Sequence, residues 1–403
     1  MKISKFFFVS QKSIKEEYQS KFLERLLRGG FIQQESTGIY TWLPLGLKVL
    51  KKTENIISEE LNKIGDIQVQ LPFLQSADLW KQSKRYESYG KEMLRVSDRH
   101  DRELIIPPTC EEQMCSLFFS KQVSYRDMNK VLYQIHWKFR DELRPRNGLM
   151  RGREFLMQDA YSFFTNEEAA KQNYLDHYNA YLSIFKKLNL DKLHVITASS
   201  GEIGGDLSHE FVIESEEGDS NAFVKNVSID YVKNLQELKN ISGDFEKQIE
   251  NTTEKRVVEI AHIFYYGTVY SEKMSYEFIN KEGKKNKFYG GCFGIGVSRL
   301  VAILSTKKYW PISVAPFSIH LLSINEKYQN ICDKIYEKLI KFYDVIVDDR
   351  SNLSYGEKMQ EADLIGAPYR IIIGEFMELY REGNLINKFS SIEDIYDILN
   401  KEI

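Results

Sequence analysis

Cysteine is scarce in this sequence, with only Cys110, Cys115, Cys292 and Cys332 in 403 residues. So few cysteines exclude a disulfide-stapled scaffold and are typical of proteins that work in a reducing compartment. Cys110 and Cys115 lack a second Cys or His pair at the spacing of zinc ligands. We therefore expect a cytoplasmic protein with no bound zinc.

Long apolar runs are missing as well. The longest run near the start covers residues 6–9, too few for a signal peptide, and no stretch approaches the about 20 apolar residues of a membrane helix. A surplus of one charge is also absent, because 55 Lys and Arg face 58 Asp and Glu. This balance excludes a protein that coats nucleic acid non-specifically, although a local basic surface remains open. No membrane partner is expected.

The length predicts two or three domains. From residue 318 onward, strands expected at 318–324, 344–348 and 369–374 alternate with helices expected at 326–342, 357–365 and 392–402, which is typical of a separate α/β domain. We place the boundary near Pro316, giving domains 1–316 and 317–403. The first domain shows amphipathic helices at 14–28 and 47–64, a further helix at 167–188, and a short strand before Pro72 that suits a sheet edge. The polar segment 213–258 lacks a clear period, and we expect it to be a small peripheral insertion.

Several arginines gather around one predicted hairpin. Apolar and polar residues alternate over residues 133–142, the period of a strand, and residues 154–164 form a returning strand. Arg140 and Glu142 then share one sheet face, although a solvated sheet edge shows the same alternation. The connecting segment adds Arg144, Arg146, Arg151 and Arg153. In a chain of net negative charge, this cluster favours a concentrated anion such as a polyphosphate or an RNA end.

A glycine-rich stretch at residues 290–299 is the second candidate. It lacks the third glycine of a dinucleotide fingerprint and the lysine of a phosphate-binding loop. Gly294 and Gly296 permit close approach to the backbone at a strand end, and Arg299 opens an apolar helix. Simple packing of a helix against a sheet would use the same glycines.

Two weaker signals concern a bound amine and a close backbone approach. Thr109 and Glu111 face the same way in an extended backbone, and a hydroxyl beside a carboxylate suits an ammonium group, although both are also ordinary helix-start residues. Residues 201–211 contain three glycines followed by His209 and Glu210. A lone histidine in a loop is more often a surface residue.

The order of these features resembles motifs 1, 2 and 3 of class II aminoacyl-tRNA synthetases, and in detail the bacterial-type prolyl-tRNA synthetases. Motif 2 is represented by Phe139-Arg-Asp-Glu142 and Arg151-Gly-Arg-Glu-Phe155, and motif 3 by Gly294-Ile-Gly-Val-Ser-Arg299. Further matching stretches are residues 38–46, 109–111, 138–146, 151–157, 159–163, 203–205, 208–211, 310–311, 315–317, 348–350 and 364–366. The resemblance therefore covers nearly the whole chain except about 213–258.

The resemblance implies proline–tRNA ligation in two steps, in which proline and ATP give prolyl-adenylate and the proline tRNA then takes the prolyl group. It assigns Arg140 to the α-phosphate and the substrate carboxylate, and Arg299 to the γ-phosphate. The other ATP-binding residues would be Glu142, Arg151, Phe155, Gly294 and Gly296. Thr109, Glu111 and His209 would bind proline, and Glu210 would be a candidate ligand for Mg²⁺.

The resemblance also implies an α+β catalytic domain on an antiparallel sheet and a small α/β anticodon-binding domain. Helix 47–64 and the strand before Pro72 would form a homodimer interface, and Arg350 and Lys358 are candidate tRNA contacts. Residues 213–258 are too few for the editing domain of many bacterial relatives, so we expect a short form without editing in cis. Pro107, Gln158 and Asp206 replace residues usual in the family.

Two alternatives remain at this point. One is a synthetase of the same fold for another amino acid, or a paralogue that lost aminoacylation. The other is a non-catalytic tRNA-binding or regulatory module. Arg140, Glu142 and Arg299 together favour an enzyme, because a binding module has no need to grip a triphosphate from two sides.

Overall fold

The computed structural model describes residues 1–14, 20–199, 201, 205, 207–389, 394–395 and 398–399. The chain folds into two compact units. Unit 1 comprises Met1–Ser36, Tyr40–Thr53 and Val301–Ile403, whereas unit 2 comprises Thr37–Ile39 and Glu54–Leu300. No described helix has both the length and the apolar character needed to cross a membrane.

Unit 2 is built on a nine-stranded sheet that is mostly antiparallel, which confirms the expected α+β class. Its strands are, in spatial order, β11 (Leu207–Glu214), β10 (Leu193–Thr197), β13 (Gly243–Asp244), β12 (Ser220–Lys225), β14 (Thr252–Gly267), β17 (Gly290–Gly296), β9 (Glu154–Phe163), β8 (Lys130–Phe139) and β3 (Ile67–Gln68). The short β3 lies at one edge and pairs in parallel with β8. The edge position predicted for this segment is therefore confirmed.

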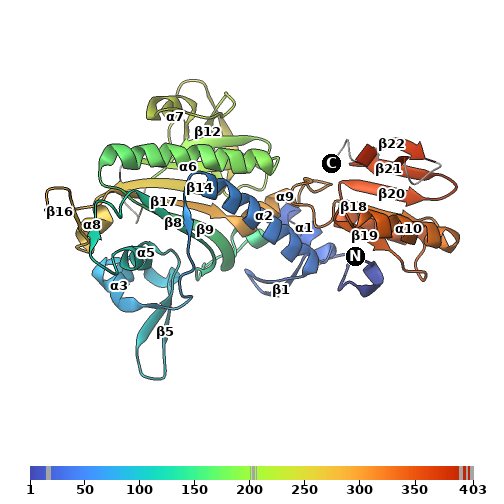
Figure 1. Ribbon diagram of the computed structural model, residues 1–403, viewed down its shortest axis with the longest axis horizontal. Coiled ribbons are helices and arrows are strands. Elements are labelled where there is room, and N and C mark those ends of the chain that lie inside the picture. Colours follow the sequence, from blue (N-terminus) through green and yellow to red (C-terminus); the bar gives the residue numbers. More distant parts are fainter. Residues whose placement is uncertain are drawn as a thin grey trace. The chain divides into compact units, whose positions relative to one another are not determined.

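One face of the sheet is covered by α6 (Glu167–Lys187), which runs across β14 and β17 in Figure 1. The helix begins after Asn166, whose side chain accepts a hydrogen bond from the Ala169 amide at 2.9 Å. Tyr174, Tyr178 and Tyr181 recur at helical spacing and are fully buried. The predicted helix 167–188 is confirmed, and its buried stripe seals this face of the sheet.

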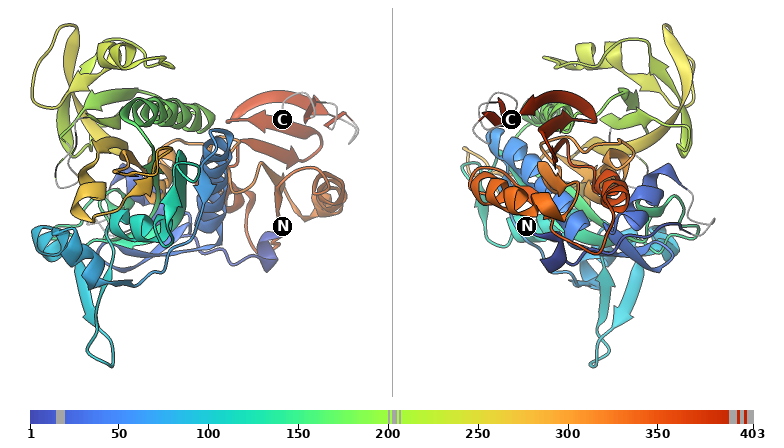
Figure 2. Two further views of the ribbon diagram at one scale, coloured as in Figure 1. Left: turned by 60° about the vertical axis from the view of Figure 1, so that its left-hand side comes forward. Right: turned by 90° about the vertical axis from the view of Figure 1, so that its right-hand side faces the viewer.

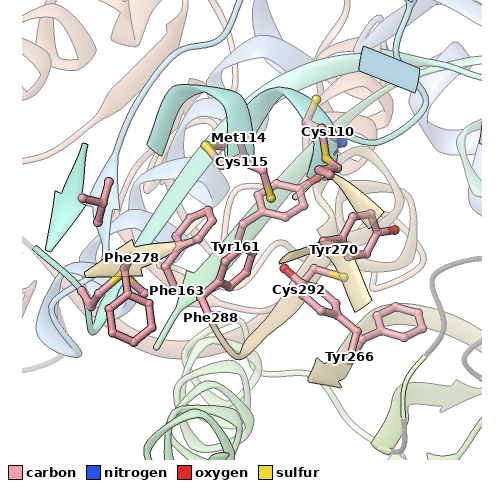
Figure 3. Close-up of a cluster of buried hydrophobic side chains, with 14 of the residues drawn as sticks. Cys110, Met114, Cys115, Tyr161, Phe163, Tyr266, Tyr270, Phe278, Phe288 and Cys292 are labelled. Carbon is pink, nitrogen blue, oxygen red and sulfur yellow. Dashed lines mark hydrogen bonds between the residues drawn. The ribbon is translucent and has the colours of Figure 1, made fainter. Parts of the chain in front are cut away.

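The opposite face carries short helices over an aromatic cluster. These helices are α3 (Ala77–Gln82), α4 (Arg85–Ser88), α5 (Glu111–Phe118) and α8 (Val269–Lys273). The cluster is drawn in Figure 3 and includes Tyr161, Tyr266, Tyr270 and Cys292. All four cysteines of the chain are free and buried. This packing fixes the start of α5 against strand β9.

The smaller strands of unit 2 form two further sheets. β4 (Gln75–Ser76), β6 (Glu103–Ile106) and β5 (Leu94–Ser97) make one, and β16 (Lys285–Asn286), β15 (Phe278–Ile279) and β7 (Val123–Ser124) make the other. Figure 2 shows the β5–β6 hairpin extending away from α3 and α5. Helix α7 (Leu235–Ile241) lies in the segment between β12 and β13.

Unit 1 contains a five-stranded sheet with β19 (Val345–Asp348), β18 (Ile319–Ser323), β20 (Tyr369–Ile373), β21 (Met377–Arg381) and β22 (Asn384–Phe389) in that order. Its helices are α10 (Gln329–Leu339) and α11 (Tyr355–Ile365), the latter with a capping box formed by Ser354 and Glu357. β18 pairs in parallel with β19 and β20. The alternation predicted from residue 318 is thus confirmed up to β20.

Unit 1 also contains α1 (Lys21–Arg28) and β1 (Ile32–Ser36). Three elements belong partly to each unit, namely β2 (Ile39–Trp42), α2 (Pro44–Lys63) and α9 (Val297–Leu304). The predicted helix 47–64 corresponds to α2 and is confirmed. The second half of the predicted helix 14–28 corresponds to α1, whereas residues 15–19 are outside the described residues. Most positions of the predicted helix 392–402 are also outside the described residues.

Two expectations about local structure were wrong, and one alternative is excluded. The strand predicted over 133–142 ends at Phe139, because the chain turns where the Glu142 amide bonds to the Arg140 carbonyl at 2.7 Å. The polar face of that strand is not a solvated edge, since Gln134 and Lys138 are fully buried. The segment 213–258 is not a peripheral insertion, because it supplies β12, β13 and part of β14 to the main sheet.

Candidate active site

Two adjoining cavities open on the same part of unit 2. The first, here called the basic cavity, has a volume of about 500 Å³ and is lined by residues that include Arg140, Arg146, Arg151 and Arg299. The second, the inner cavity, measures about 540 Å³ and is lined by Thr109, Glu111 and Tyr161 among others. Both are lined by Glu92, Arg140, Met157, Glu259, His262 and Gly294. One elongated ligand can therefore occupy both cavities.

Arg140 lies at the junction of the two cavities. Its guanidinium donates to the Pro108 carbonyl, with Nη2 at 3.2 Å, and its Cζ lies 5.3 Å from the centroid of the Phe155 ring. Arg140 directly follows Phe139, the last residue of strand β8. Because the guanidinium is held on one side by a neutral carbonyl, its positive charge remains available to an anion.

Arg299 reaches the basic cavity from the first turn of α9. Its Nε donates to the Met150 carbonyl at 2.9 Å, and its Nη1 donates to the Glu259 carbonyl at 2.6 Å. The two arginines are thus far apart in the sequence and line one cavity, as predicted. A Cβ atom at Gly294 would lie 2.4 Å from the Met157 methyl group, so the glycine at this position keeps space for that side chain.

The loop after β8 contributes a second charged pair to the basic cavity. Glu142 accepts a hydrogen bond from the Arg151 Nε at 2.8 Å, and this bond is the main cause that lowers the pKa of Glu142. Arg146 lines the same cavity, whereas Arg144 and Arg153 are not among its lining residues. Only part of the predicted arginine cluster therefore faces the cavity.

Thr109 and Glu111 come together in the inner cavity, but not through an extended backbone. Glu111 is the first residue of α5, and the Thr109 hydroxyl donates to its Oε2 at 2.7 Å. The Tyr161 hydroxyl fixes this turn, since it accepts from the Cys110 amide at 2.7 Å and lies 3.1 Å from the Thr109 Oγ1. The helix-start interpretation is therefore confirmed for Glu111, and both Thr109 and Glu111 line the inner cavity.

Arg85 is a residue of this site that the sequence analysis missed. It lines the inner cavity, and its Nη1 lies 3.0 Å from the Glu111 Oε2. The same Nη1 lies 3.0 Å from the Glu112 Oε1. Two adjacent buried glutamates need a cation, but the sequence shows only that Glu111 and Glu112 are neighbours and not that they are buried.

The structure does not bring His209 to either cavity. Residues on β11 alternate between the faces of the sheet, so Ser208 and Glu210 face the cavity side whereas His209 faces α6. There its Nδ1 lies 2.7 Å from the Tyr174 hydroxyl, and burial followed by the charge of His262 lowers the pKa of His209 to about 4. The expectation that His209 lines the pocket is corrected accordingly.

His262 is the histidine that lines both cavities. A β-bulge makes this possible, because β11 pairs Phe211 with Ala261 but Val212 with Glu259, leaving Ile260 as an extra residue in β14. Glu259 and His262 are three positions apart and still line the same cavities. In a regular strand, residues at this spacing would point to opposite faces.

Glu210, Glu259 and His262 form a cluster with the spacing of metal ligands, each offering an atom within 4.8 Å of the others. Burial, reinforced by the charge of Glu259, raises the pKa of Glu210 to about 9. At Glu259 burial is outweighed by His262 and Arg299, which lower the pKa to about 2. Two carboxylates held this close fit a hard divalent cation such as Mg²⁺.

The remaining predicted residues lie elsewhere. In unit 1, Lys358 is only 5% exposed and its Nζ lies 3.5 Å from the Asp348 carbonyl, so it is not presented to RNA. Arg350 is bound to both carboxylate oxygens of Asp348. In unit 2, Gln158 faces α6 and accepts from the Tyr181 hydroxyl at 2.7 Å. Residues 202–204 and Asp206 are outside the described residues.

Comparison with known sequences identifies both parts of the chain. A family model described as the tRNA synthetase class II core domain (G, H, P, S and T) matches residues 94–308, and one described as an anticodon binding domain matches residues 312–378. The proline--tRNA ligase of Rickettsia bellii is 40% identical over 417 residues, covering 98% of this chain and 96% of the relative. The proline--tRNA ligase of a Wolbachia species is 41% identical over 392 residues, covering 93% and 92%.

Solved structures agree in fold. The prolyl-tRNA synthetase of Cryptosporidium parvum complexed with halofuginone and AMPPNP has a TM-score of 0.77 at 19% identity, covering 96% of this chain and 78% of that one. Its complex with L-proline and AMP has a TM-score of 0.75 at 18% identity, covering 96% and 76%. The fold of this chain is therefore a known architecture. By sequence and by fold, this chain is a member of the proline–tRNA ligase family of class II aminoacyl-tRNA synthetases.

Proposed function

We propose that the protein activates L-proline with ATP and transfers the prolyl group to the proline tRNA. The observation that carries this proposal is the position of Arg140 between a cavity whose lining includes four arginines and a cavity that contains a buried carboxylate. A triphosphate fits the first environment and a substrate ammonium fits the second. Arg140 is then within reach of both the α-phosphate and the substrate carboxylate.

The first step joins these two groups. A carboxylate oxygen of proline attacks the α-phosphorus of ATP, the bond to the β-phosphate oxygen breaks, and pyrophosphate leaves. Arg140 offsets the charge that develops between the two reactants, and Arg299 holds the far end of the triphosphate. Such a reaction depends on positioning and charge stabilisation, so it needs no protein nucleophile.

The other residues of the basic cavity bind the nucleotide. Phe155 stacks against adenine, Glu142 accepts from the adenine amine, and Arg151 holds the outer phosphates, with Gly294 and Gly296 lining the cavity beside the ligand. Glu210 and Glu259 would hold Mg²⁺, which supplies positive charge beside the phosphates when it is bound. In the inner cavity Thr109 and Glu111 bind the substrate amine.

In the second step the terminal ribose hydroxyl of the tRNA attacks the prolyl carbonyl carbon, and AMP leaves. We assign tRNA anticodon binding to residues 317–403, supported by the anticodon binding domain match at 312–378. Because Lys358 is buried and Arg350 is paired with Asp348, other side chains of this domain must contact the RNA. We expect the protein to work in the cytoplasm.

Amino-acid-dependent exchange of pyrophosphate into ATP tests the proposal. Exchange that depends on proline supports it, and exchange with another amino acid would identify a synthetase of different specificity. A protein that binds tRNA but shows no exchange with any of the 20 amino acids would be a binding module instead.

A homodimer is the expected assembly. Ile67 in the edge strand β3 and the following Phe73 and Leu74 are 45%, 43% and 46% exposed, an apolar edge that an exposed strand normally avoids. We expect light scattering to give twice the chain mass of 47.3 kDa. The double substitution Phe73→Asp and Leu74→Asp should shift the protein towards the monomer, and a monomeric parent protein would contradict this assignment.

The protein should not correct alanine mischarged onto the proline tRNA. The segment 213–258 forms β12, α7 and β13 together with the ends of β11 and β14, which leaves no separate hydrolytic domain within it. We expect alanyl-tRNA(Pro) to be lost at the same rate with and without the purified protein. Rapid deacylation, measured with labelled alanine, would refute the short-form assignment.

A further inference from the structure

At the start of α5, two buried carboxylates share one buried guanidinium. The side chains of Arg85, Glu111 and Glu112 are 3%, 1% and 0% exposed. A single atom, the Arg85 Nη1, lies 3.0 Å from the Glu111 Oε2 and 3.0 and 3.2 Å from the two oxygens of Glu112. This arrangement is distinct from the pairing of one acid with one base that usually makes buried charge tolerable.

The surroundings hold the guanidinium in place. Its Cζ lies 4.9 Å from the Trp80 ring centroid, 5.6 Å from that of Tyr89 and 5.7 Å from that of Tyr270, which is labelled in Figure 3. The Ser83 hydroxyl lies 2.7 Å from the Glu112 Oε1 as its donor. Aromatic faces attract the cation without neutralising it.

The charges of this cluster do not cancel. One guanidinium against two carboxylates leaves one negative charge, and the neighbouring buried pair of Lys138 and Asp159, at 2.9 Å, is neutral in itself. Burial disfavours charge on both glutamates. At Glu111, Arg85 and the Thr109 hydroxyl outweigh burial and lower the pKa. At Glu112, Arg85 also acts against burial, but burial together with the charge of Glu111 outweighs it and the pKa is raised.

One oxygen of the cluster is still available. Glu111 Oε2 accepts from Thr109 and Arg85, but Oε1 has no hydrogen-bond partner among the described residues. Glu111 lines the inner cavity, and Glu112, on the next position of the helix, does not. The uncompensated charge is therefore presented to the cavity by Glu111 alone.

We propose that Arg85 and Glu112 are positioning residues for the substrate amine, with Glu112 neutralising Arg85 so that the charge of Glu111 remains available to the ammonium. This inference rests on the proposed activation of proline. Arg85 orients Glu111, and without Glu112 the same guanidinium would neutralise it. The bound ammonium brings the net charge of the cluster to zero.

The decisive variant is Glu112→Gln, which keeps the shape of the side chain and removes its charge. We expect the KM for proline in pyrophosphate exchange to rise about tenfold, while the KM for ATP and kcat change less than twofold, because the lost attraction acts equally in the ground state and the transition state. A proline KM within twofold of the parent overturns the inference. A parent protein with no proline-dependent exchange overturns the proposed function instead, so the two failures are distinguishable.

Ser83→Ala is the matched control, because it removes a hydrogen bond to Glu112 without changing any charge. We expect it to lower the melting temperature and leave the proline KM unchanged. If Ser83→Ala raises the proline KM as much as Glu112→Gln does, the role of Glu112 is structural and the inference is wrong.

A charge-balanced double variant separates charge from packing. Arg85→Met with Glu112→Gln restores a net charge of −1 on Glu111, so we expect its proline KM to lie below that of Glu112→Gln alone. A purely structural role predicts no such recovery, since the double variant also loses the contact of Arg85 with Glu111. A double variant that binds ATP normally and has a still higher proline KM would contradict the charge argument.

Discussion

Arg140→Ala is expected to lower the rate of proline-dependent pyrophosphate exchange by about 10²–10³-fold, the effect of losing one fixed donor to charge in the transition state. Arg140 lines both cavities and is held by the Pro108 carbonyl. The loss should be seen in kcat, since the arginine stabilises charge that develops during the reaction. Dimer formation and the melting temperature should change little.

Arg144→Ala is the matched control for this experiment. Arg144 belongs to the same loop, is exposed and is not among the residues that line the basic cavity. We expect normal exchange from this variant in the absence of tRNA. If Arg140→Ala keeps the exchange rate of the parent, or if Arg144→Ala loses as much, the role assigned to Arg140 is wrong.

Lys138→Ala is expected to destabilise the fold by about 3–5 kcal/mol, the usual cost of removing one partner of a buried ion pair. Lys138 is fully buried, and its Nζ lies 2.9 Å from the Asp159 Oδ1. Burial disfavours its charge, but Asp159 outweighs burial and raises the pKa of Lys138. Urea denaturation followed by tryptophan fluorescence measures the loss.

One further variant separates the effect of charge from that of volume, and a second one measures a surface ion pair for comparison. Lys138→Met fills nearly the same space without the charge, so it should lose almost as much stability as Lys138→Ala. Lys171→Ala removes an exposed helix pair with Glu167 and should cost less than about 1 kcal/mol. A loss below 1 kcal/mol for both Lys138 variants would show that Asp159 does not need this partner.

The sequence was sufficient for elements with a strong period and for residues in a contiguous motif. α6 and β9 lie where the pattern predicts them, and Arg140 and Arg299 line one cavity as expected. Local propensity could not reveal β21 and β22, a two-stranded extension of the unit 1 sheet whose turn uses the positive φ of Glu382 and Gly383. That extension depends on pairing with β20 rather than on its own pattern.

The errors at the site have different physical causes. His209 was chosen for its residue type beside Glu210, but the strand alternation of β11 turns it towards α6. His262 could not be placed, because its face depends on a bulge that the sequence does not mark. Arg85 comes from a short helix outside the recognised motifs, and only the buried charge of Glu111 and Glu112 explains its position.

The extra residue in β14 has a consequence for anyone who wishes to exchange the segment between β11 and β14. Ile260 offsets the pleat by one step, so Glu259 and His262 share a face only while that offset is kept. Grafts that end before Val257 leave the offset intact, whatever their length. A graft that deletes one residue between Val257 and His262 would turn one of these two side chains to the opposite face of the sheet. The cluster with Glu210 would then be lost, although all three of its residues would still be present.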